Sequence, residues 1–130
     1  MNDLSTSASD KKNVTKRIRE LNDRFRKRLP VVTDIPGRVM LTVGIKELCS
    51  TEAEPMVHLP ALFELIRTYD DFNYNNDPHA EHDFGNFKFQ GETCFWKTEY
   101  YAPDMMSGAE DPSDPHRSFR VITIMLAREY

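Results

Sequence analysis

The chain has 130 residues, 39% of them hydrophobic and 29% charged, and a formal net charge of -4 at pH 7. This length predicts one domain that can bury a core without disulfides or metals. Cys49 and Cys94 have neither paired spacing nor a CxxC pattern, so we expect reduced thiols and a cytoplasmic location. Because no apolar run approaches the roughly 18 residues of a membrane span, and residues 1–13 lack a signal-peptide core, we expect neither insertion nor export.

The start of the chain is basic, whereas the remainder is acidic. Residues 1–28 contain nine Lys or Arg against four acids, and residues 29–130 contain eight against seventeen. Residues 1–9 are polar without periodicity and are predicted to form a disordered tail. Residues 10–29 are predicted to form a basic amphipathic helix that starts at an Asp10 cap, with this apolar stripe: Val14, Ile18, Leu21 and Phe25. The basic face suits nucleic acid or an acidic protein partner, and plain solvation is the alternative.

Residues 30–130 are predicted to form a single α+β domain. β-branched and apolar residues favour a strand at 38–45, apolar on both faces. The main helix is expected to begin near Pro60 and to end near residues 70 and 71. Its buried stripe consists of Leu59, Leu62, Phe63, Ile66 and Tyr69.

A β-hairpin is predicted beyond the polar loop at 73–83. Its strands are expected at 87–89 and 93–101 around a Gln90-Gly91 turn. The non-periodic segment 102–118 reads as a long functional or mobile loop, and a final strand follows at 119–127, apolar on both faces. Together these elements predict a small, mostly antiparallel sheet of about four strands with two packed helices. Its two-faced strands need cover on both sides, from the basic helix or from a partner chain in a homodimer.

Two histidines and several acids lie close together in the polar loop. A divalent metal held by His79, His82 and Asp83 would leave an open position to activate water. The spacing matches no recognised zinc signature, however, and the alternative is a turn at Asp77 in which Glu81, His82 and Asp83 cap backbone groups.

A metal-free hydrolase is a second interpretation of the same loop. Its catalytic residues would be His82, Asp83 and Glu81, since a carboxylate can orient an imidazole that works as acid and base. Tyr100 or Lys97 would bind an anion nearby. This interpretation lacks a nucleophile, because a cysteine within an aromatic strand, like Cys94, is more often a small buried hydrophobe.

A non-enzymatic interaction protein is the leading interpretation. A protein partner would contact the basic helix, the Asp-rich loop and the Met-bearing loop, with these residues as candidates: Arg17, Arg24, Arg28, Asp77, Met105 and Met106. Nucleic-acid binding through residues 10–29 is the further alternative.

Three stretches carry a family resemblance: NDPHAEHDFG at 76–85, FWKTEYY at 95–101, and DPSDP at 111–115 followed by RVITIMLAREY at 120–130. With them, the chain from about residue 36 resembles a small bacterial family, domain of unknown function 3768. The resemblance implies no assigned chemistry. It does imply genes often found on plasmids and other mobile elements, and hence an accessory or anti-defence inhibitor. His79 falls where this family varies, which shifts attention to Glu81, His82 and Asp83.

Overall fold

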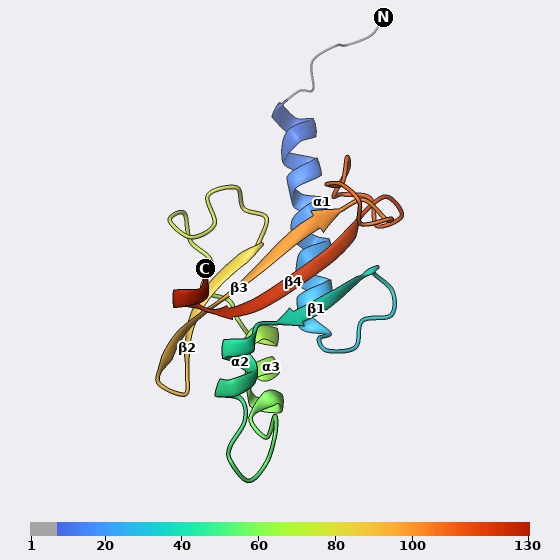
Figure 1. Ribbon diagram of the computed structural model, residues 1–130. Helices are drawn as coiled ribbons and strands as arrows, with labels where there is room; N and C mark the ends of the chain where they lie inside the picture. Colours follow the sequence, from blue (N-terminus) through green and yellow to red (C-terminus); the bar gives the residue numbers. More distant parts are fainter. Residues whose placement is uncertain (1–7) are drawn as a thin grey trace, which may run out of the picture.

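The computed structural model describes residues 8–130, and its centre is one four-stranded sheet (Figure 1). The strands are β1 (Gly37–Leu41), β2 (Phe84–Phe89), β3 (Glu92–Tyr101) and β4 (Phe119–Leu126), in the spatial order β1-β4-β3-β2. β1 runs parallel to β4, and the other two pairs are antiparallel. The predicted α+β class with a mostly antiparallel sheet is therefore confirmed.

The basic segment is a helix that docks on the sheet. Helix α1 (Ala8–Lys27) buries Ile18 and Phe25 of the predicted stripe. Residues 8 and 9, expected in the disordered tail, are helical instead, because the helix begins before Asp10 and places that acid in its favourable first turn. Residues 1–7 of the predicted tail lie outside the described part of the chain.

The strand predicted at 38–45 is wrong in its second half. β1 ends at Leu41, and helix α2 (Val43–Leu48) follows at once. The reason is Thr42, whose hydroxyl accepts a bond from the Ile45 N–H at 3.3 Å and caps the new helix. The Glu129 carboxylate accepts a bond from the same hydroxyl at 2.6 Å and so ties this cap to the end of the chain.

The remaining elements keep their predicted order with shifted ends. Helix α3 (Leu59–Arg67) begins beside Pro60 and stops a turn earlier than predicted. β2 starts at Phe84 rather than 87, and the Gln90-Gly91 turn between β2 and β3 has both residues at positive φ, as a tight hairpin requires. A short 3-10 turn, η1 (Ala127–Glu129), follows β4. No helix within residues 8–130 has the length and apolarity to cross a membrane.

All three α-helices of residues 8–130 cover the same face of the sheet (Figure 1). One buried cluster joins Phe25 of α1, Ile45 of α2 and Leu62 of α3 to Trp96 and Ile122 of the strands. α1 therefore does not supply a second layer on the opposite face, which was one of the two predicted sources of cover. That opposite face, called here the helix-free face, consists by strand alternation of Arg38, Met40, Phe84, Asn86, Lys88, Thr93, Phe95, Lys97, Glu99, Tyr101, Phe119, Val121, Thr123 and Met125.

Candidate functional site

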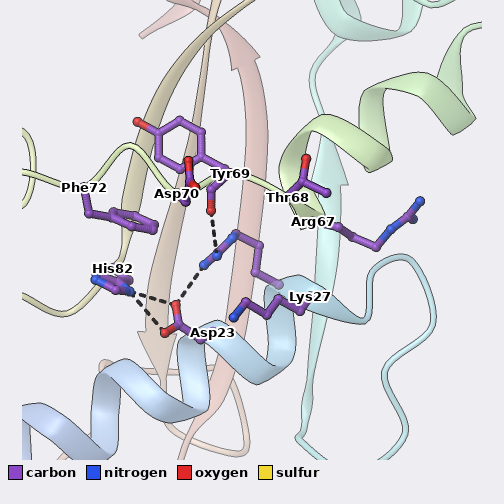
Figure 2. A pocket seen from close by; sticks show the side chains of 9 residues that line it. Asp23, Lys27, Arg67, Thr68, Tyr69, Asp70, Phe72 and His82 are labelled. Carbon is purple, nitrogen blue, oxygen red and sulfur yellow. Dashed lines mark hydrogen bonds and ion pairs between the residues drawn. The ribbon is translucent and has the colours of Figure 1, made fainter.

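The loop before β2 meets helix α1 at His82. Its Nδ1 lies 2.8 Å from an oxygen of Asp23, and its Nε2 lies 3.7 Å from Asp77 (Figure 2). The imidazole also stacks on Phe72, with 3.8 Å between ring centroids and 6° between ring planes. Two carboxylates and an aromatic ring thus fix the orientation of this imidazole.

The Asp77 carboxylate organises the loop around His82. It is 7% exposed and accepts bonds from the backbone N–H groups of Glu81 at 3.1 Å and His82 at 3.2 Å. Ala80 and His82 both adopt positive φ, which gives the loop its tight reversal. The sequence placed Asp77 on a partner surface, but its carboxylate is buried and holds the backbone instead.

Glu81 belongs to a second network at the other side of α1. The Tyr100 hydroxyl donates to its carboxylate at 2.7 Å, and Asn22 donates to the same hydroxyl at 2.7 Å and to the Glu81 carbonyl at 2.9 Å. The Asn22 side-chain oxygen in turn accepts a bond from Nε of Arg120 at 2.7 Å. Burial raises the pKa of Tyr100 and lowers the pKa of Arg120. The raised pKa keeps the Tyr100 hydroxyl protonated, so it donates to Glu81.

A cavity of about 470 Å³ lies between α1, the end of α3 and His82 (Figure 2). The buried Arg26 contributes to its wall, and each of its three side-chain nitrogens donates a hydrogen bond. Nε donates to the Ile66 carbonyl at 3.1 Å, one terminal nitrogen binds Asp23 at 3.0 Å, and the other binds the Tyr69 carbonyl at 3.1 Å. This guanidinium therefore joins α1 to the end of α3.

The predicted catalytic residues do not converge on one point. Glu81 faces Tyr100, His82 faces Asp23, and burial, followed by the charge of Glu81, raises the pKa of Asp83. The thiol of Cys94 is buried, and this burial raises its pKa to about 11, which disfavours the thiolate that a nucleophile needs.

The predicted metal ligands are also separated. His79 lies in another groove, beside the first turns of α1, whereas His82 points into the cavity. Among residues 8–130, no three His, Cys, Asp or Glu side chains are grouped to hold a metal ion. The contacts of His82 with Asp23 and of Glu81 with Asn22 instead fix this loop to α1.

The predicted partner-binding residues occupy three different environments. Arg24 and Arg28 both pair with Asp34, at 2.9 and 2.5 Å, whereas Arg17 is exposed. Met106 is 83% exposed on the long loop, and Met105 is half-buried at the edge of the helix-free face.

The helix-free face is a second candidate site. It contains a hollow of about 550 Å³ over β1, β4 and β3, with Met40, Val121 and Tyr101 in its wall. The register places Val121 between Arg38 of β1 and Glu99 of β3, and Thr123 between Met40 and Lys97. At the level of Val121, β4 thus has a cation on its β1 side and an anion on its β3 side, where Glu99 also pairs with Lys97 at 3.6 Å.

Residues 41–129 match the family described as protein of unknown function (DUF3768). The chain belongs to the DUF3768 family. Neither a curated protein nor a solved structure matches the chain. The DUF3768 match includes the loop of Glu81 and His82 and the strands β2, β3 and β4, whereas α1 lies before it. Each network at the loop therefore joins a residue inside the matched segment to one outside it.

Sequence reasoning missed four residues of these networks: Asn22, Asp23, Arg26 and Arg120. Asn22 and Arg26 continue the spacing of Ile18 by four and eight residues, so they lie on the docking face of α1. That spacing was the available signal. Asn and Arg are seldom buried without partners, and the partners of these two residues are distant in the chain, so the spacing alone does not predict their burial.

Proposed function

We propose that the protein is a non-enzymatic interaction protein and that its helix-free face binds a second copy of the chain. The supporting observation is the arrangement of charge about β4, with Arg38 on one side of Val121 and Glu99 on the other. Neither candidate for chemistry offers a free nucleophile or a convergent metal site among the described residues. The described residues therefore support a binding role for this protein better than a catalytic one.

A two-fold axis along β4 makes this face complementary to itself. Such an axis places the β1 residues of one copy opposite the β3 residues of the other, at the same level along the strands. Arg38 then faces Glu99 of the second copy, and the same contact recurs on the other side. Val121 faces its own equivalent, but it is already only 6% exposed, so the apolar surface that the dimer newly covers comes from side chains such as Met40, which is 44% exposed.

Two exposed apolar side chains are also placed to meet under the same two-fold rotation. Tyr130 is 74% exposed and lies over β3, against Phe95 and 5.5 Å above Lys97. Val43 is 70% exposed and directly follows β1. Since β1 and β3 exchange places across the axis, Tyr130 of one copy approaches Val43 of the other.

The size of the face predicts a weak dimer. Eight residues of β4 span roughly 27 Å, and four strands span roughly 19 Å. The resulting flat area of roughly 500 Å² lies below the roughly 800 Å² that each partner contributes to a standard interface. We therefore expect dissociation in the micromolar range, to be followed between about 1 and 300 μM by sedimentation equilibrium.

Charge reversal tests the arrangement. Arg38→Glu or Glu99→Arg changes two symmetry-related contacts at once, which should cost about 2 kcal/mol and weaken the dimer roughly 30-fold. The double variant restores opposite charges and should recover wild-type affinity. Lys46→Glu, on the exposed side of α2, is the control with the same change of net charge as Arg38→Glu.

Two results would contradict the proposal. One is a wild-type chain that stays monomeric at 300 μM. The other is a double variant that is weakened by as much as both single variants together. Thermal unfolding of each variant checks that the exposed substitutions leave the fold intact.

The wider role that we propose follows the mobile-element setting implied by the family resemblance. An accessory protein or an inhibitor of host defence acts by occupying a target, which needs a surface rather than a reaction. A cytoplasmic location belongs to the same proposal and agrees with two buried, unpaired thiols.

A further inference from the structure

A groove of about 540 Å³ separates the first turns of α1 from the loop at 78–80. Its cationic lining comes from Lys11, Lys12, Lys16 and Arg19, and His79 stands on the opposite wall. Arg19 donates to the Ala80 carbonyl at 2.9 Å, which fixes the loop wall against the helix. Among the described residues, no carboxylate lines this groove, although the whole chain carries a net charge of -4.

The lysines of the groove differ from the arginines near the end of α1. Within residues 8–130, Lys11, Lys12 and Lys16 make no ion pair. Arg24 and Arg28 share Asp34, and Arg26 is buried against Asp23. Among the described residues Lys27 also makes no ion pair, so most, but not all, of the unneutralised charge of the helix lies in its first half, which extends beyond the sheet (Figure 1).

The spacing of these cations fits a phosphodiester backbone. Lys12, Lys16 and Arg19 follow one another by four and three residues, so they share one side of α1 and span about 10.5 Å along its axis. Phosphates of one strand of B-form DNA advance about 3.4 Å along the helix axis, so three steps cover the same length.

The lining also indicates which part of a nucleic acid is bound. The other lining residues are small or polar, such as Thr15 and Pro78, and among the described residues no Phe, Tyr or Trp lines the groove for base stacking. Phosphate contacts position a nucleic acid without reading its sequence. The acidic body repels the remainder of the strand, so the ligand should follow α1.

We propose that this groove binds the phosphodiester backbone of nucleic acid without sequence preference. The site is independent of the helix-free face and of the dimer proposed there. An acidic protein would be attracted by the same charges, but a row of cations at regular helical spacing with no carboxylate among them favours a ligand recognised through regularly spaced anions.

The test is fluorescence anisotropy of the full chain with labelled 15-mers of single-stranded DNA, duplex DNA and duplex RNA, in 25 to 200 mM salt. Four cationic contacts predict a slope of log K against log salt of about -3.6 for duplex DNA. The variant Lys12→Gln with Lys16→Gln should reduce that slope by about 1.8 and weaken binding at least tenfold at 50 mM salt. Lys46→Gln with Lys88→Gln removes the same charge elsewhere and should leave both quantities unchanged.

Three results would overturn the proposal. They are no binding of any oligonucleotide at 25 mM salt, unchanged binding by the Lys12 and Lys16 variant, and equal affinity for a poly-glutamate of the same charge. The last result would identify the groove as a site for an acidic protein. The charge reversals at Arg38 and Glu99 do not touch this groove, so failure here is separate from failure of the dimer.

Discussion

Asn22→Ala tests whether the buried network, rather than the apolar stripe alone, holds α1 on the sheet. Asn22 is 2% exposed and makes three side-chain hydrogen bonds, to Arg120, Tyr100 and the Glu81 carbonyl. Loss of this amide leaves the charged Nε of Arg120 without its acceptor and the Glu81 carbonyl without its donor, away from solvent. A bond to a charged group contributes about 1.5–3 kcal/mol, and a stranded acceptor costs about 1–3 kcal/mol. We expect a loss of about 3 kcal/mol.

Asn13→Ala is the matched control, because Asn13 is exposed on the same helix. Both substitutions gain the same helix propensity, so the difference between them isolates the network. In urea, an m value of about 2 kcal/mol/M converts 3 kcal/mol into a midpoint lower by about 1.5 M. The reasoning is refuted if the two variants unfold within 1 kcal/mol of each other by circular dichroism.

Three further predictions concern buried groups. Burial, then the charge of Glu81, raises the pKa of Asp83, so its ionised form costs stability once the pH exceeds the unfolded value of about 4. Asp83→Asn should therefore raise the urea midpoint at pH 7, and the gain should vanish near pH 3.5. Because burial raises the pKa of Cys94 to about 11, a thiol reagent at pH 8 should label it only after unfolding; rapid labelling of native protein would contradict this. Gly85→Ala would place a Cβ 2.0 Å from Nε1 of the buried Trp96 and should cost at least about 2 kcal/mol in thermal unfolding, whereas Gly108→Ala, with its nearest atom at 3.9 Å, should be neutral.

The sequence predicted what depends on short-range pattern. The spacing of Ile18 and Phe25 identified the docked face of α1, and Gln90-Gly91 identified the hairpin turn. The class and the antiparallel majority of the sheet followed from element order. The strand predicted through Ile45 failed because β-branched residues continue past Leu41, while the Thr42 cap that starts α2 also depends on Glu129 at the other end of the chain.

The parts of the site that the sequence did not predict are those that depend on long-range pairing. One of the two interpretations of the EHD sequence, the hydrolase, predicts a convergent cluster at residues 81–83. Glu81 and His82 instead point to opposite partners, because positive φ at His82 turns the chain between them. In the sequence, Asn22 is a polar interruption of an apolar stripe. Its burial is explained only by Arg120, 98 residues away, which donates a hydrogen bond to it. Sequence spacing carries no information about such a partner.

The two sides of α1 impose different demands on any binding experiment. Its inner side supplies Phe25 to the core, Asn22 to the Arg120 network and Asp23 to His82. Removal of the first 28 residues would therefore unfold the domain as well as remove the basic surface. Loss of nucleic-acid binding by a truncated chain would therefore say nothing about the groove. Substitution of Lys12 and Lys16 removes charge from the outer side only and leaves every contact of the inner side in place. Because of this division, one helix can hold the domain together and still present unneutralised cations to a ligand.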